Sequence, residues 1–375
     1  MIKLISQRMR RLGLFVGGFT TMGLLIAMPA QALDLSAVKA DIEKHKAVPE
    51  FQAPGPAFDA VNCMTGKKIL TVPFASQIPF VATVVSSMVD LGKEIGFPYN
   101  EYKNTGERSQ WIQGINQGIN EHYSLIDLFA PDLLSLVPQA KQAAAANIPI
   151  VASHDGGYEQ VRPEPFLSVP ADYFTAGKLL AEWAIMRTEG KANVLVVTAL
   201  DSYSSESIIN GIKAGFADCP TCKVQFTNVA VTDWSTRIQP TVQAAIVGNT
   251  ELNFILPTYD PMTQFVVPAI ALTHSADRVK VASFNGTPFA LDLVREGKLD
   301  MDIAESLDWV GHGVVDAEMR MLCRPQDVKD RKVDPKVPLR IFDATNVAEA
   351  GIPAKSSTGF GDSYKSAYRK LWELK

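Results

Sequence analysis

Short apolar runs that alternate with helical segments constrain the fold of this chain more than any other feature. Residues 67–170 contain the runs KKILTVPFA, LIDLFA and IPIVAS, and a second round from about residue 171 contains NVLVVTAL, LNFILPTY and VKVASFN. Strands that are apolar on both faces, each followed by a helix, indicate parallel sheets covered on both sides. Two such rounds in 375 residues predict an α/β protein with two doubly wound, Rossmann-like lobes.

The first 32 residues have the layout of a secretory signal. A basic segment, MIKLISQRMRR, precedes an apolar run that gives way to Pro29-Ala30-Gln31-Ala32, a small-residue cleavage pattern. The alternative is a membrane anchor, for which the run is marginal in length. Cleavage after Ala32 predicts a soluble periplasmic protein.

Composition and motifs exclude several classes of function. The net charge is −4, and loss of the basic leader makes it more negative, so no basic nucleic-acid face is expected. Phosphate-loop, dinucleotide, nucleophile-elbow and zinc-protease motifs are missing, and the acidic run DVKDRKVDP lacks calcium-loop spacing. We therefore predict no cofactor, no metal and no catalysis. A hydrolase using His154-Asp155 is the enzymatic alternative, with Ser204 or Ser205 expected to cap a helix.

Four cysteines, an even number in an oxidising compartment, suggest disulfides. Cys219 and Cys222 have C-x-x-C spacing, but they lie between a helix and a strand and no second such pair exists for zinc. A local structural disulfide is favoured over a redox or metal motif. Cys63 and Cys323 are then left as a possible second pair.

Polar and aromatic residues gather where the predicted strands end. Open α/β sheets bind ligands beyond the carboxyl ends of their strands, so these positions are the candidate site. They read Phe74-Ala75-Ser76-Gln77, Ser153-His154-Asp155-Gly156, Asp201-Ser202-Tyr203, Pro257-Thr258-Tyr259-Asp260, Asn285-Gly286-Thr287 and Glu305-Ser306.

The order of several motifs resembles periplasmic sugar-binding proteins of the ribose/galactose type, the substrate carriers of ABC importers. The motifs are KKILTVPFASQIPF, IPIVASHD, ADYFTAGKLLAEW, FNGTP and EGKLDMDIAESLDWVG, and they span roughly residues 67–325. The resemblance implies a type I periplasmic binding protein fold with a hinge of three crossing segments, near 168–172, near 303–307 and after Pro338. It also implies a monomer that closes over its ligand.

The resemblance also implies the domain borders. An N-terminal extension, 33–66, precedes an N-terminal lobe of residues 67–170 plus 307–375 and a C-terminal lobe of residues 171–306. The helix Val310–Cys323 would return to the N-terminal lobe, where Cys63 lies, so a Cys63–Cys323 disulfide fits this arrangement.

The family's sugar contacts, carried over position by position, fall on ten residues. They are Phe80, His154, Asp155, Tyr173, Asn210, Trp234, Tyr259, Asp260, Asn285 and Glu305. Four of these residues could instead have a purely structural role. Phe80 could fill the core, Trp234 could pack a loop, and Tyr173 or Asp260 could cap a helix. The register at His154-Asp155 stays open by one residue.

Departures from the family pattern bear on the ligand. Asn210 replaces a helix arginine, Asn285 replaces a carboxylate and Glu305 replaces an amide. Without an arginine or lysine at a matched position, a sugar acid is disfavoured. The prediction is a small neutral polyhydroxylated solute, a sugar or polyol, delivered to an ABC permease. A modified sugar and a more apolar or even cationic molecule are the alternatives. Presentation of the ligand to a chemoreceptor or sensor kinase is the second interpretation.

Overall fold

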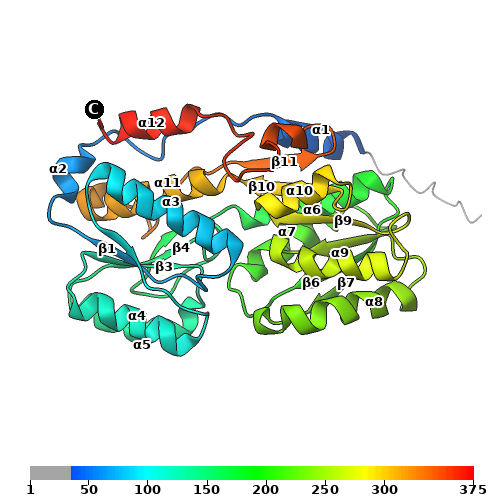
Figure 1. Cartoon of the computed structure of the whole chain (residues 1–375), viewed down its shortest axis with the longest axis horizontal. Coiled ribbons are helices and arrows are strands. Elements are labelled where there is room, and N and C mark those ends of the chain that lie inside the picture. Colours follow the sequence, from blue (N-terminus) through cyan, green and yellow to red (C-terminus); the bar gives the residue numbers. More distant parts are fainter. Residues whose placement is uncertain (1–34) are drawn as a thin grey trace, which may run out of the picture. The chain divides into compact units, whose positions relative to one another are not determined.

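The computed structural model describes residues 35–375, and the predicted signal peptide, residues 1–32, lies outside the described residues. Two sheets organise the chain (Figure 1). No helix within residues 35–375 is both long enough and apolar enough to cross a bilayer.

The first sheet is entirely parallel, as predicted, with the strand order β2-β1-β3-β4-β5. Its strands are β1 (Ile69–Thr71), β2 (Tyr99–Glu101), β3 (Leu125–Phe129), β4 (Ile150–Ser153) and β5 (Leu167–Val169).

Neighbouring residues of these strands face opposite sides and enter separate cores. Ile69 and Leu125 join the core that contains α3 (Pro79–Ile95), whereas Leu70 and Ile126 join the core with α4 (Arg108–Asn120) and α5 (Val137–Ala145). In Figure 1, α3 and α4 lie on opposite sides of these strands. Burial on both faces explains why the strands read as continuous apolar runs.

The second sheet has the order β11-β10-β9-β8-β6-β7, and β11 is its one antiparallel strand. Its strands are β6 (Asn193–Thr198), β7 (Lys223–Asn228), β8 (Phe254–Pro257), β9 (Lys280–Asn285), β10 (Met301–Glu305) and β11 (Leu339–Asp343). The accompanying helices are α6 (Tyr173–Arg187), α7 (Ser205–Phe216), α8 (Gln239–Gly248), α9 (Thr263–Leu272) and α10 (Pro288–Arg295). Helices α6 and α7 pack backbone to backbone, because Gly177 and Gly211 have no side chain to separate them.

The segment after residue 306 serves both sheets. Helix α11 (Leu307–Cys323) packs on α3, and α12 (Ser363–Leu371) packs on α11. Strand β11, however, pairs with β10 in the second sheet, so the prediction that placed all of 307–375 in the N-terminal lobe is wrong for β11. The edge of β10 would otherwise be open, and β11 satisfies its backbone groups. The other domain borders stay predictions.

The N-terminal extension touches elements that belong to both sheets. From α1 (Leu35–Lys46), Asp41 pairs with Lys178 of α6 at 2.8 Å, and Lys46 pairs with Asp343 of β11 at 3.1 Å. Farther along, the amide of Phe58 donates to the carbonyl of Leu371 at 2.9 Å. The extension is therefore part of the folded structure between Leu35 and Lys67.

Both disulfides are present as predicted. Cys63, in α2 (Ala60–Met64), is bonded to Cys323 at the end of α11, with Cα atoms 5.9 Å apart. Cys219 is bonded to Cys222 in the turn between α7 and β7, with Cα atoms 5.4 Å apart. The second bridge closes a local turn and opens no helix, so its role is structural.

Candidate functional site

A cavity with about 540 Å³ of empty space, part of it open to solvent, lies where strands of both sheets end. Open α/β sheets bind ligands at such a place, beyond the carboxyl ends of their strands. It is lined by Phe74, Ile78, Phe80, Val81, Ala130, His154, Tyr173, Ser202, Ser204, Val231, Trp234, Tyr259, Pro261 and Asn285. These residues follow β1, β3, β4, β6, β7 and β8, end β9, or begin α3 and α6. The lining contains no Lys, Arg, Asp or Glu.

Aromatic rings build the wall on the side of the first sheet. Phe80 sits in the first turn of α3, which Pro79 opens with its fixed φ. The Phe80 ring centroid lies 5.1 Å from the centroid of the His154 imidazole and 6.0 Å from that of Phe129. These separations are those of packed aromatic pairs.

His154 is held by hydrogen bonds on both ring nitrogens. Its Nδ1 lies 2.7 Å from the Tyr173 hydroxyl, and its Nε2 lies 2.9 Å from Oε2 of Glu305. Burial raises the pKa of Tyr173 well above 10, so its hydroxyl stays protonated. That hydroxyl has one proton and two acceptors, Nδ1 and the His154 carbonyl at 3.0 Å; when it donates to the nearer Nδ1, the Nε2–H donates to the Glu305 carboxylate. Both nitrogens are then used, and the imidazole offers only its ring to the cavity.

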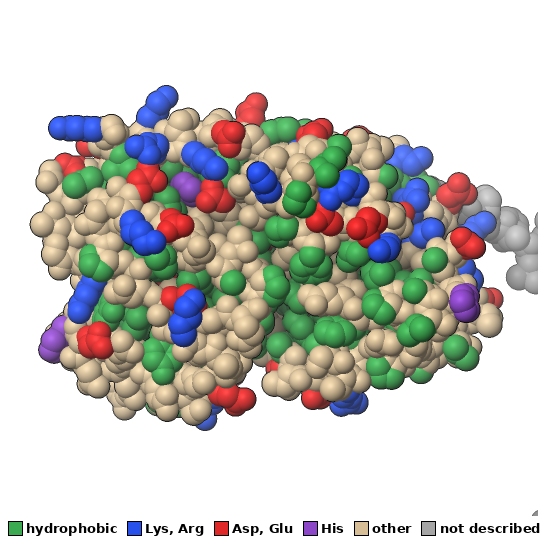
Figure 2. Space-filling view, in the orientation of Figure 1, with side chains coloured by type: hydrophobic (Ala, Val, Ile, Leu, Met, Phe, Trp, Pro, Cys, Tyr) green, Lys and Arg blue, Asp and Glu red, His purple; other side chains and the backbone are tan. Residues whose placement is uncertain are grey.

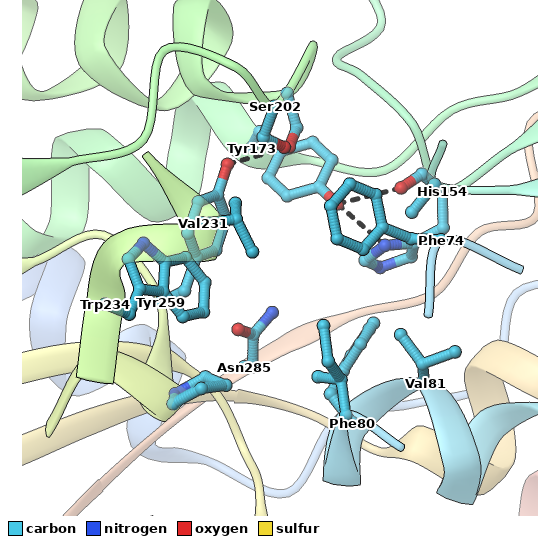
Figure 3. Close-up of a pocket in the computed structure, with 14 residues that line it drawn as sticks. Phe74, Phe80, Val81, His154, Tyr173, Ser202, Val231, Trp234, Tyr259 and Asn285 are labelled. Carbon is cyan, nitrogen blue, oxygen red and sulfur yellow. Dashed lines mark hydrogen bonds between the residues drawn. The ribbon is translucent and has the colours of Figure 1, made fainter. Parts of the chain in front are cut away.

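Trp234 and Tyr259 form the wall on the side of the second sheet. Their rings are stacked, with centroids 6.5 Å apart. The Trp234 indole N–H donates to the carbonyl of Val229 at 3.1 Å, and the Tyr259 hydroxyl lies 2.7 Å from the Ser204 hydroxyl. Figure 3 shows these rings across the cavity from His154 and Phe80.

The expected serine cap of α7 is wrong. Ser204 precedes the helix but makes no side-chain cap hydrogen bond. Its hydroxyl, like that of Ser205 at 3.1 Å, instead faces the Tyr259 hydroxyl. The buried phenol provides a partner from another strand end, which the local sequence does not reveal.

Asn285 ends β9 with a backbone φ of 146°, a region that side-chain-bearing residues rarely adopt. Its amide points into the open centre of the cavity in Figure 3. Within residues 35–375 its side chain makes no hydrogen bond, although the residue is buried. An unusual backbone conformation that directs an unpaired amide into a cavity is a hallmark of a binding position.

Six of the ten predicted contacts line this cavity: Phe80, His154, Tyr173, Trp234, Tyr259 and Asn285. Asn210 does not, because it lies exposed on α7. Glu305 is buried behind His154 and lines a separate small cavity. Asn210 and Glu305 therefore do not line this cavity, contrary to the prediction.

The two predicted aspartates are also turned away from the cavity. Asp155 is buried and bonded to the Arg162 guanidinium at 3.0 Å, and burial raises its pKa despite that partner. Asp260 accepts hydrogen bonds from the amide and hydroxyl of Thr287, at 2.8 and 2.6 Å. Both carboxyl groups have internal partners, so they hold loops together and do not face a ligand.

Several lining residues were missed in the sequence. Phe74 and Ser202 belong to strand ends that the sequence singles out, but nothing there distinguished the residue that faces inward, and Pro261 lies just beyond such an end. Ala130 and Val231 follow β3 and β7 without any polar signal. The fold brings Ala130 and Val231 together because the ends of separate strands meet at the cavity.

A larger outer groove, of about 1530 Å³ of empty space, adjoins the cavity and shares five of its lining residues. The shared residues are Phe74, Ile78, Val231, Trp234 and Pro261. Polar side chains such as Gln77, Arg108 and Gln264 appear only in the outer groove. The groove is therefore a route from solvent into an apolar interior. Within residues 35–375, no cluster of His, Cys, Asp and Glu is arranged to hold a metal ion.

Comparison with known proteins identifies one matching family. Residues 69–323 match a family model described as a periplasmic binding protein domain. No curated protein sequence matches the chain at a significant level.

Solved structures share the fold at low sequence identity. A myo-inositol binding protein from Caulobacter, bound to myo-inositol, matches with a TM-score of 0.66 and 17% identity, covering 75% of this chain and 95% of its own. An ABC transporter solute binding protein from Agrobacterium vitis, bound to α-D-tagatopyranose, matches at 0.67 and 17%, covering 76% and 96%. The binding protein of the arabinose ABC transporter from Shewanella sp. ANA-3, bound to L-arabinofuranose, matches at 0.65 and 15%, covering 82% and 96%.

Proposed function

Because the chain belongs to the periplasmic binding protein domain family, we propose that it captures a small neutral solute and delivers it to an ABC permease of the inner membrane. The observation that carries this proposal is the cavity at the carboxyl ends of strands from two sheets, lined without any Lys, Arg, Asp or Glu side chain. Sugars and polyols, the class that the sequence predicts, are what the matched structures hold.

The family implies a periplasmic location. We attribute export to residues 1–32, acting as a cleaved signal, and we expect the mature protein to act as a monomer. Presentation of the bound solute to a sensor is the other role that this fold allows, but no feature of residues 35–375 favours it over import.

The protein is a binding protein and not an enzyme. The family and the matched structures are solute-binding proteins. The hydrolase alternative also lacks its geometry, because Asp155 is bonded to Arg162 and His154 is oriented by Glu305. Both nitrogens of His154 are engaged, which leaves none to activate a nucleophile.

Thermal unfolding in the presence of a solute panel tests this function. One narrow class of neutral solute should raise the melting temperature, since a ligand at 100 times its Kd stabilises the folded state by about 2.7 kcal/mol. An Asn210→Ala variant, changed on the exposed face of α7, is the control and should respond like the unaltered protein. If sugars, polyols, acids, amines and ring compounds all leave the melting temperature unchanged, the solute-binding function is refuted.

A further inference from the structure

The polar atoms of the aromatic lining residues are hydrogen-bonded to other groups of the protein. The Tyr173 hydroxyl is bonded to His154, the Tyr259 hydroxyl to serines, and the Trp234 N–H to a backbone carbonyl. A hydrogen-bonding group that already has a partner gains little from a ligand. These residues therefore present ring faces and edges to a ligand, not donors or acceptors.

The acidic side chains near the cavity also do not line it. Asp155, Asp260 and Glu305 sit close behind the lining, yet each is buried with an internal partner: Arg162, Thr287 and His154. No cation lines the cavity to pair with an acidic ligand. A charged solute would lose its hydration without gaining a counter-ion, which is costly in a buried site.

Asn285 is the exception. Its amide has a donor and an acceptor, both without a partner within residues 35–375, and it faces the centre of the cavity (Figure 3). The Ser202 hydroxyl, 3.0 Å from that of Ser204, also keeps capacity for a further hydrogen bond. The cavity thus offers one open amide and little else to a polar ligand.

These features conflict with what a free sugar requires. A monosaccharide or inositol carries a hydroxyl on nearly every carbon, and each hydroxyl buried without a partner weakens binding by roughly tenfold. Rings on two sides of the cavity suit a flat apolar molecule, because aromatic groups bury large areas against planar faces. Around a hollow near the centre of the face seen in Figure 2, hydrophobic side chains also gather.

We propose that the solute is an uncharged, largely apolar ring compound that packs between the Phe80–His154 wall and the Trp234–Tyr259 wall and binds Asn285 through one oxygen or amide group. This inference rests on the proposed function, since it names the class of solute that the transport protein carries. The proposed ligand therefore differs from the sugars and polyols bound in the matched structures, although those structures share the fold.

A direct comparison of solute classes tests the inference. Calorimetric titrations would use benzamide, acetophenone and coumarin as neutral ring probes, benzoate as the charged counterpart of benzamide, and myo-inositol, D-allose and L-arabinose as polyols. We expect at least one neutral ring probe to bind at least tenfold more tightly than every polyol, and benzamide to bind at least tenfold more tightly than benzoate.

The failures of the two proposals are distinguishable. A polyol that binds as tightly as the best ring probe, or benzoate that binds as tightly as benzamide, overturns the inference and leaves the transport function standing. If no compound of any class binds, the proposed function fails and the inference fails with it.

Substitutions at Asn285 and Trp234 locate the binding. Asn285→Asp keeps the shape but adds a charge, and should weaken the best ring probe at least tenfold. Asn285→Gly removes the amide while suiting the backbone φ of 146°, and should weaken that probe about tenfold even if the aspartate variant folds poorly. Trp234→Ala should weaken it between about 5-fold and 150-fold, and Trp234→Phe should restore most of the affinity. Unchanged affinity in both the glycine and the alanine variants would overturn the inference.

Discussion

Asp127 offers a sharp test of how burial controls the stability of the first lobe. Its carboxyl group lies in β3 and accepts hydrogen bonds from the hydroxyls of Thr71, at 2.7 Å, and Ser153, at 2.5 Å. Burial raises the pKa of Asp127 to about 7, although both hydroxyls lower it. The neighbouring Glu318, which accepts from Tyr99 at 3.1 Å, also has a pKa raised by burial.

The sign of the pH effect follows from proton binding. An aspartate in an unfolded chain has a pKa of about 3.9, so between that value and 7 the folded state holds a proton that the unfolded state has lost. The contribution of Asp127 to the free energy of unfolding must therefore fall as pH rises through this window. For Asp127 alone, the loss between pH 5 and pH 8 is about 2–3 kcal/mol, most of it below pH 7.

Urea unfolding followed by tryptophan fluorescence at pH 5, 6, 7 and 8 measures this slope. Asp127→Asn keeps the size of the side chain and removes its titration, so the variant should lose about 2–3 kcal/mol less than the unaltered protein over that range. Asp90→Asn, on the exposed face of α3, is the control and should keep the original slope. An Asp127→Asn variant whose slope equals that of the unaltered protein would refute the reasoning.

Three further sets of substitutions test interactions that hold the fold together. Replacing Cys63 and Cys323 by serine should cost about 2–4 kcal/mol of unfolding free energy in urea, and an unchanged midpoint would show that the bridge contributes nothing. Arg162→Leu leaves a buried carboxylate unpaired and should cost about 3–5 kcal/mol by the same assay; a loss below 1 kcal/mol would contradict that pairing. Gly177→Val should lower the melting temperature well below that of Gly248→Val, because a side chain at Gly177 meets the α7 backbone and one at Gly248 meets nothing within 4 Å; equal melting temperatures would argue against the close contact.

The parallel sheets were predictable because their strands are buried on both faces. Runs such as IPIVAS have no polar alternation, and helical segments alternate with these runs along the chain. Strand β11 was not predictable in the same way. It arrives from a loop after α11 and pairs antiparallel with β10, and that pairing depends on an open sheet edge that no local pattern encodes.

The aromatic half of the site was also predictable, because Phe80, Trp234 and Tyr259 stand at positions that match the family's sugar contacts, although core or loop packing was an alternative for the first two. The carboxylates were not. At a strand end, Asp155 and Asp260 look like ligand contacts, and only the folded chain shows that one oxygen of each is bonded to Arg162 or Thr287. Whether a polar group faces a ligand or a neighbour depends on a partner elsewhere in the chain.

The same internal pairing connects ligand binding to the arrangement of the chain at the site. His154 follows β4, while its partners Tyr173 and Glu305 begin α6 and end β10, so one imidazole joins the two sheets. The ring of that imidazole is also part of the cavity wall, packed on Phe80. A ligand that packs on this wall contacts a residue whose orientation depends on both segments. Ligands stabilise the conformation to which they bind best, so binding at this wall must favour the arrangement in which the Tyr173–His154–Glu305 hydrogen bonds are intact.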